Sequence, residues 1–225
     1  MIEEDIEVLT NANESDWIRR LSLINIILEP LKTIRFNFLG ARPMNIRNTT
    51  DRYGALSIGI HWLMLLMFIA VYACIELHEF FPKGSDLRAT LKTWHFMLGL
   101  SILVLAPLRL IVYITGTAPR IEPDPSKWQK QSAKLIHVAL YALMIAMPLA
   151  GWLLLSAEGQ PIPFFGLHLP ALIGKNKFLA DVIEEIHEAG GTIGYFLIGL
   201  HATAALYHHY FVRDNTLRRM LPNRD

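Results

Sequence analysis

Four apolar stretches, each near the length of a membrane-crossing helix, follow one another along the chain from residue 53 onwards. They occupy residues 53–75, 94–114, 133–156 and 190–212. A helix of about 20 apolar residues spans the hydrocarbon core of a bilayer. The pattern therefore predicts an all-α membrane protein built as a bundle of four transmembrane helices.

Residues 1–50 carry a different pattern. An acidic start is followed by apolar residues at three- and four-residue steps, with basic residues elsewhere around the helix. The apolar positions are Trp17, Leu21, Ile24, Leu28 and Leu31. This spacing predicts an amphipathic helix on the membrane surface, with a partner-docking segment and an incomplete crossing as alternatives. We therefore divide the chain into an extension, 1–50, and a bundle domain, 51–225.

The distribution of basic residues predicts the orientation in the membrane. Four crossings place both termini on one side, and that side holds most of the basic residues that flank the helices. They are Arg42, Arg47, Arg52, Arg120, Lys127, Lys130, Arg213, Arg218, Arg219 and Arg224. The opposite side holds Lys83, Arg88, Lys92, Lys175 and Lys177. Because basic loops stay in the cytoplasm, we expect both termini to be cytoplasmic.

Composition supports the membrane assignment and excludes several other classes. Hydrophobic residues make up 52% of the chain and charged residues 18%, which is too apolar for an average soluble domain. The net charge of +1 gives no indication of nucleic-acid binding. A single cysteine, Cys74, cannot form an internal disulfide or a cysteine-rich metal cage. The sequence has no C-x-x-C-H motif, so covalently attached c-type haem is excluded.

Seven histidines lie within the apolar stretches or at their edges. They are His61, His95, His137, His187, His201, His208 and His209. An imidazole is costly to bury in a membrane without a partner, so this number indicates haem ligation, a proton path or a transition-metal site. A soft-metal transporter would ordinarily add cysteine or methionine clusters or carboxylates at the midplane, and a proton pump would bury Asp or Glu. The helix interiors contain no such carboxylate. We therefore favour haem.

The spacing of four histidines predicts two haem sites. His187 and His201 are 14 residues apart, which on one helix corresponds to about 21 Å of rise on nearly the same face. His61 and His201 both fall in the cytoplasmic half of their stretches. His95 is expected to begin the second helix, and His187 to precede the fourth, on the outer side. Matching depths pairs His61 with His201 and His95 with His187 as axial ligands of two b-type haems.

The remaining polar residues gather near the cytoplasmic boundary. His137 and His208 are too shallow to be the preferred ligands, and Arg109 lies at a similar depth, 14 residues after His95. We expect this edge to bind haem propionates, or to hydrogen-bond and protonate a quinone head group. For His209 we expect an interfacial role without chemistry.

Small residues near the predicted ligands fit a flat cofactor. Gly59, Gly99, Gly194 and Gly199 lie beside or between the histidines. They would let the backbone approach a porphyrin, and the alternative is ordinary helix contact through small residues.

Five segments carry a resemblance to a known family. They are RYGALSIGIHWL at 52–63, HFMLGLSILVLAPLRL at 95–110, HVALYALMIAMPLAGW at 137–152, HEAGGTIGYFLIGLH at 187–201 and HHYFVRDNTLRRMLP at 208–222. With them the chain resembles the bacterial four-helix cytochrome b561 family, and especially its superoxide oxidase members. The resemblance covers residues 51–222 and leaves residues 1–50 without a counterpart.

The resemblance implies a fold, cofactors and an activity. The fold is a four-helix bundle of the cell inner membrane, with two b haems on His61, His95, His187 and His201. Superoxide oxidases take single electrons from superoxide, release dioxygen and reduce ubiquinone. His208 and His137 match positions near the cytoplasmic edge and are implied as quinone-binding or proton-handling residues.

On both sides of the membrane, acidic residues weaken the positive charge that would attract an anionic substrate. Glu122 and Asp124 dilute the basic stretch that contains Lys127 and Lys130. On the outer side, acidic residues outnumber the basic ones, so superoxide would gain little from long-range attraction.

Three functions follow as hypotheses. The first is an enzyme, a di-haem b cytochrome that oxidises superoxide and passes the electrons to ubiquinone. The second is a cytochrome b relay subunit that links a peripheral dehydrogenase or hydrogenase to the quinone pool, with the segment from Trp17 to Phe36 as its dock. The third is a haem-free membrane bundle whose histidines are satisfied by the protein.

Overall fold

Four long helices form the part of the chain that the computed structural model describes, residues 45–222. They are α2 (Ala55–His78), α3 (Asp86–Thr115), α4 (Lys127–Glu158) and α5 (Lys177–Tyr207). Each is long and apolar enough to cross a membrane, with mean hydropathies of 2.2, 2.2, 2.1 and 1.3. The predicted four-helix membrane architecture is therefore confirmed. The predicted amphipathic helix that begins at Trp17 lies outside the described residues.

Three of the four long helices, α3, α4 and α5, begin earlier than the apolar stretches suggested. α3 starts at Asp86 and α5 at Lys177, each well ahead of its predicted span. The Ser85 side chain accepts a hydrogen bond from a first-turn backbone N–H of α3, and the Asn176 side chain does the same for α5. Such N-caps satisfy N–H groups that have no partner within the helix. Hydropathy alone misses these turns because they are polar.

The early starts correct two expectations about the histidines. His95 was expected to begin the second helix and His187 to precede the fourth. Both lie well inside a helix instead, His95 in α3 and His187 in α5. A helical backbone fixes the direction of each side chain more tightly than a loop would.

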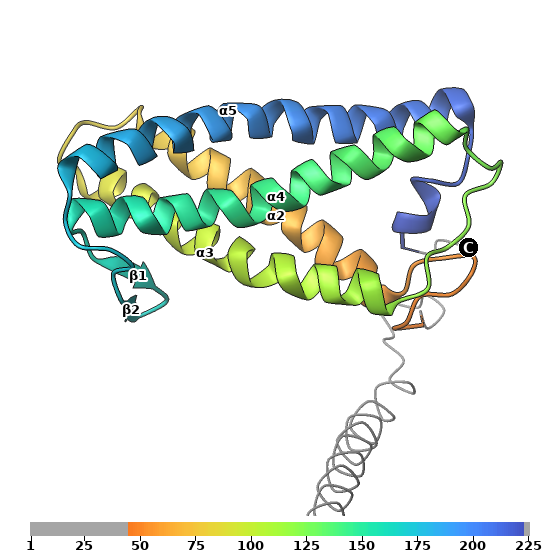
Figure 1. The fold of residues 1–225 in the computed structure, drawn as a ribbon, viewed down its shortest axis with the longest axis horizontal. Helices are drawn as coiled ribbons and strands as arrows, with labels where there is room; N and C mark the ends of the chain where they lie inside the picture. The colour runs from red at the N-terminus through yellow and green to blue at the C-terminus, as the bar shows by residue number, and fades with distance from the viewer. Residues whose placement is uncertain (1–44, 223–225) are drawn as a thin grey trace, which may run out of the picture. The chain divides into compact units, whose positions relative to one another are not determined.

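The two ends of the bundle are built differently. At one end, the α4–α5 connection carries a hairpin of β1 (Ile162–Phe164) and β2 (Leu167–Leu169), which the sequence did not predict (Figure 1). Its two-residue turn, Phe165–Gly166, has φ angles of 47° and 86°, as the twist of a tight hairpin requires. We call this the hairpin end. The opposite end, where the start of α2, the α3–α4 connection and residues 213–222 meet, is the tail end (Figure 1).

The apolar core is made mainly by α2, α3 and α4. One buried cluster joins Ile60, Met64, Ile102, Ala106 and Met144, and a second joins Leu100, Leu155 and Ile162. Within residues 45–222, neither cluster includes a side chain of α5. Helix α5 therefore contributes its histidines to the interior but no side chain to these two clusters, and Ala180 is its one buried apolar side chain among the described residues.

Residues 213–222 close the tail end through backbone acceptors. The Trp62 indole donates to the Met220 carbonyl at 2.8 Å, and the Arg52 guanidinium donates to the Leu221 carbonyl at 3.1 Å. The buried Arg219 side chain donates to the Pro119 carbonyl and lies over the Tyr53 ring, 5.6 Å from its centroid. These contacts hold the C-terminal segment against the start of α2.

Replacing Asn48 by alanine should destabilise the tail end by about 1–2 kcal/mol. The Asn48 side-chain oxygen accepts hydrogen bonds from the Gly54 backbone at 2.9 Å and from the Ser57 hydroxyl at 2.7 Å, at the start of α2. Thermal unfolding in detergent measures the loss. Thr50→Ala is the control, because among residues 45–222 the Thr50 hydroxyl donates only to its exposed neighbour Asp51. Equal stability of the two variants would contradict this role.

Candidate functional site

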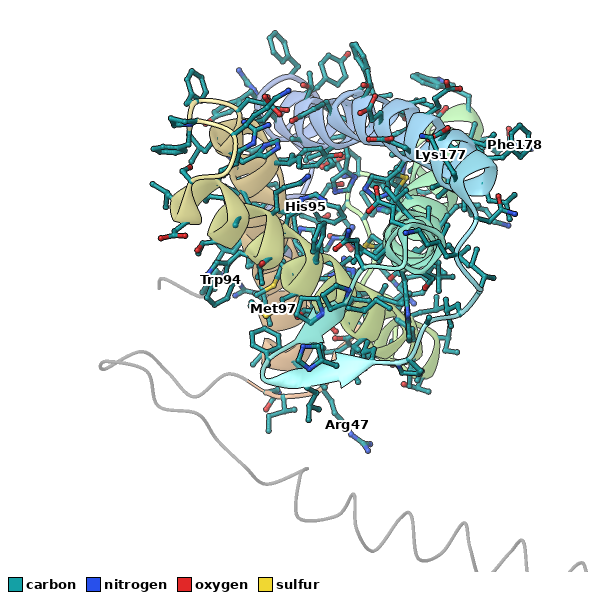
Figure 2. All side chains as sticks on the ribbon, turned by 90° about the vertical axis from the view of Figure 1, so that its left-hand side faces the viewer. Arg47, Trp94, His95, Met97, Lys177 and Phe178 are labelled. Carbon is teal, nitrogen blue, oxygen red and sulfur yellow. The ribbon has the colours of Figure 1, made fainter. Side chains whose placement is uncertain are left out.

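A first histidine pair lies toward the hairpin end. The rings of His95 on α3 and His187 on α5 have centroids 6.1 Å apart and planes inclined by 75°. His95 points into the space between the helices, whereas its neighbour Trp94 points outward (Figure 2). The His95 Nδ1 atom lies 3.0 Å from the Val71 carbonyl, so Nδ1 carries the hydrogen. This leaves Nε2 with a free lone pair, the state of a metal-ligating imidazole.

The other member of this pair, His187, has no hydrogen-bond partner for its Nδ1 atom within residues 45–222. His187 Nδ1 is buried, and the backbone of Met147 lies beside it without hydrogen-bond geometry. Gly151 on α4 makes room for the ring, since a Cβ there would lie 3.3 Å from His187 Cε1. A buried polar atom left unpaired is costly. His187 is therefore poorly explained as a histidine satisfied by the protein alone.

A second group of three histidines lies toward the tail end. The His61 ring on α2 has its centroid 6.2 Å from that of His201 on α5, with planes inclined by 66°. The His137 ring on α4 lies 5.4 Å from the same His201 ring. Arg109 on α3 is close enough for its charge to act on all three imidazoles. The structure thus brings His137, which was expected near the boundary, into contact with a predicted ligand.

Ring spacing distinguishes the possible pairs. A metal–imidazole bond is about 2 Å long and the ring nitrogen lies roughly 1.1 Å from the centroid, so two rings on opposite sides of one ion are roughly 6.3 Å apart. The separations of 6.1 Å for His95 and His187 and 6.2 Å for His61 and His201 fit this arrangement. The 5.4 Å separation of His137 from His201 is shorter. The four histidines therefore fit two haems, each between one pair.

A site made by protein side chains alone is not seen in the described part of the chain. Among residues 45–222, no group of three or more His, Cys, Asp or Glu side chains is placed to hold a metal ion. Two imidazoles per site suit an ion whose other ligands come from a porphyrin. The donor set thus matches a b haem.

The sequence left two roles open for Gly59, Gly99, Gly194 and Gly199: space for a porphyrin, or contact between helices. Gly59, Gly99 and Gly199 have no heavy atom within 4 Å of the position that a Cβ would take. At Gly194 a Cβ would collide with the Tyr72 hydroxyl, so this glycine serves a contact between α5 and α2. Three of the four glycines therefore leave space that a flat cofactor could use.

His208 occupies a separate position beyond α5. It begins the short π-helical turn η1 (His208–Val212), and its ring neighbours that of Tyr207 at 6.1 Å. The His208 Nδ1 atom lies 2.5 Å from a carboxylate oxygen of Asp214, which is 2% exposed. The structure thus joins His137 to the three-histidine group and His208 to Asp214. Sequence reasoning missed Asp214, although a single acid within the basic segment RDNTLRR was a usable signal.

Acidification should destabilise the protein through Asp214. Burial by itself would raise the Asp214 pKa, but hydrogen bonds from His208 and Thr216 hold the pKa below its usual value. A carboxyl whose folded pKa is depressed adds stability above its unfolded pKa of about 3.9 and loses it as pH falls through the folded pKa. Denaturation midpoints in detergent should fall more steeply below about pH 4 for the wild type than for Asp214→Asn. A parallel fall in both proteins would assign the acid sensitivity to other groups.

Comparison with known proteins covers the same region as the bundle. The sequence model of the prokaryotic cytochrome b561 family matches residues 52–223. Cytochrome b561 homolog 1 of Escherichia coli (strain K12) is 39% identical over 174 residues, which are 77% of this chain and 99% of that protein. A probable superoxide oxidase, CybB, of Yersinia pestis is 40% identical over 173 residues, 77% of this chain and 97% of that protein. Cytochrome b561 homolog 2 of Escherichia coli (strain K12) is 28% identical over 186 residues, 79% of this chain and 95% of that protein.

Proposed function

The chain belongs to the prokaryotic cytochrome b561 family of membrane electron-transfer proteins, and we propose that it oxidises superoxide to dioxygen and passes the electrons to ubiquinone. The observation that carries this proposal is the pair of cross-helix histidine contacts, His95 with His187 and His61 with His201. Two b haems held by these four residues would supply one-electron transfer. The similarity to a probable superoxide oxidase supports superoxide as the donor.

The reaction needs protons as well as electrons. Two superoxide anions each lose one electron and become dioxygen, while one ubiquinone gains two electrons and two protons and becomes ubiquinol. His208 and His137 are the residues we assign to proton handling, because an imidazole nitrogen can act as a general acid or base. Arg109 is assigned to an anionic group near the three-histidine group, either a haem propionate or a polarised quinone oxygen.

The proposed orientation places the tail end in the cytoplasm of the cell inner membrane. Arg52, Arg120 and Arg213 gather at this end, in agreement with the rule that basic loops stay inside. In this orientation the protons for ubiquinol are taken from the cytoplasm. Superoxide from the outer compartment would meet the hairpin end.

The charge of the hairpin end favours a second candidate function. Acidic residues there include Glu76, Glu79, Glu184, Glu185 and Glu188, so the outer side would repel rather than attract an anion. The relay function, in which a peripheral dehydrogenase or hydrogenase delivers the electrons, does not need such attraction. It uses the same four histidines and the same quinone chemistry.

One experiment separates these functions. The full chain is purified in detergent, its haem-to-protein ratio and reduced-minus-oxidised spectrum are measured, and it is then mixed rapidly with superoxide. Two b haems reduced quickly, with the reduction abolished by superoxide dismutase, would support the oxidase. Two haems that are not reduced by superoxide but are reduced by a copurifying protein would support the relay subunit. A chain that binds no haem would overturn both.

A further inference from the structure

The carboxylate of Asp214 reaches His208 through a sharp reversal of the chain. Helix α5 opens into the wider π-helical turn η1, which is followed by Arg213, a non-glycine residue with a φ angle of 59°. The next backbone N–H, that of Asp214, donates to the His208 carbonyl at 3.2 Å. Left-handed backbone is unfavourable for a residue with a side chain and persists where the surroundings require it. Here it directs Asp214 back onto His208.

Both carboxylate oxygens of Asp214 have a partner. One faces His208 Nδ1 at 2.5 Å, and the other accepts from the Thr216 backbone N–H at 2.8 Å. The following residue, Asn215, is tied to the α3–α4 connection, since its side chain accepts from the Glu122 N–H at 3.0 Å and donates to the Arg120 carbonyl at 3.2 Å. The carboxylate is thus held from both sides and cannot turn toward solvent.

Charge around the pair favours an ionised Asp214. The buried Arg219 guanidinium acts electrostatically on Asp214 and on the Tyr53 hydroxyl, and the remaining partners of the carboxylate are His208 and Thr216. Because Asp214 is 2% exposed, its charge is screened little by water. An ionised carboxylate fixes the hydrogen of a neighbouring imidazole on the facing nitrogen and stabilises the protonated ring.

We propose that Asp214 is a positioning residue for His208, fixing the Nδ1–H tautomer so that Nε2 is the atom that delivers a proton to the reduced quinone. This inference rests on the proposed function, because it gives His208 the role of proton donor. In the transfer, the Nε2–H bond of the His208 imidazolium breaks and an O–H bond forms on the quinone. His208 then regains a proton from water, and Asp214 stays ionised throughout.

The test uses the haem-loaded full chain and the variant Asp214→Asn, which keeps the shape of the side chain and removes its charge. The haems are pre-reduced with dithionite and mixed with a short-chain ubiquinone at a series of pH values. We expect about tenfold slower haem reoxidation at neutral pH and a pH profile that differs from that of the wild type. In a His208→Ala background, Asp214→Asn should slow the reaction no further.

Asp124→Asn is the matched control. Asp124 is another tail-end acid, in the α3–α4 connection, but its side chain is 80% exposed and pairs with Lys130 at 2.7 Å. Its removal should leave the rate and the pH profile unchanged. An Asp214→Asn protein with wild-type kinetics would overturn the positioning role and leave the proposed function intact. A wild-type protein whose reduced haems do not react with quinone would overturn both.

A second measurement does not depend on activity or on the Asp214→Asn variant. The ¹⁵N spectrum of reduced, histidine-labelled wild-type protein shows which nitrogen of a neutral imidazole carries the hydrogen. The His208 signals are assigned by their loss in His208→Gln. We expect the hydrogen on Nδ1, and a hydrogen on Nε2 would overturn the inference.

Discussion

Replacing His201 by leucine should remove one haem and leave the other in place. His201 is the α5 member of the tail-end pair, so its loss leaves His61 without a residue on the opposite side of the iron. The hairpin-end pair lies about 21 Å away along α5 and shares no ligand with it. The haem-to-protein ratio of the purified variant should fall from about two to about one.

The reciprocal variant and two controls make this prediction specific. His187→Leu should remove the hairpin-end haem instead and leave the tail-end haem. His137→Leu should keep both, because the His137 ring lies closer to His201 than two ligands of one iron would. His168→Leu should also keep both, since His168 is exposed on β2. Two haems retained in His201→Leu would show that the pairing is wrong, and loss in His137→Leu but not in His61→Leu would move the ligand to α4.

The apolar pattern predicted the four helices because bilayer thickness sets their length. Counting depth along those helices then paired His61 with His201 and His95 with His187, and the rings of each pair do face one another across helices. The count brought these rings to matching positions although the starts of α3 and α5 were predicted too late. The 14-residue step on α5 is a property of the helix itself and does not depend on where the helix begins.

Two contacts at the tail end have physical causes that a hydropathy pattern does not contain. His137 lies only three residues after Lys134 and was therefore expected near the boundary, yet α4 begins at Lys127 and carries Lys134 on its second turn, and the His137 ring contacts that of His201. A lysine can extend its charged end to the membrane surface while its backbone lies deeper. The contact of Asp214 with His208 depends on the left-handed backbone at Arg213. An arginine in the sequence does not predict a left-handed backbone.

Replacing His208 by alanine should keep both haems and slow their reoxidation by ubiquinone about 100-fold. His208 lies seven residues beyond His201 and pairs with Asp214, so its removal takes a proton donor from the tail end without touching an axial position. The reduced haems should still form at the wild-type rate, because electron entry does not involve this residue. Stopped-flow spectra of the pre-reduced protein mixed with a short-chain ubiquinone measure the effect.

The adjacent residue supplies the control for this prediction. His209→Ala removes a second imidazole from the same π-helical turn, and we expect its quinone kinetics to stay within about twofold of the wild type because His209 does not face Asp214. Equal slowing in both variants would mean that the turn itself, rather than the His208 imidazole, supports the reaction. Unchanged kinetics in His208→Ala would move proton delivery to His137, whose ring already contacts His201.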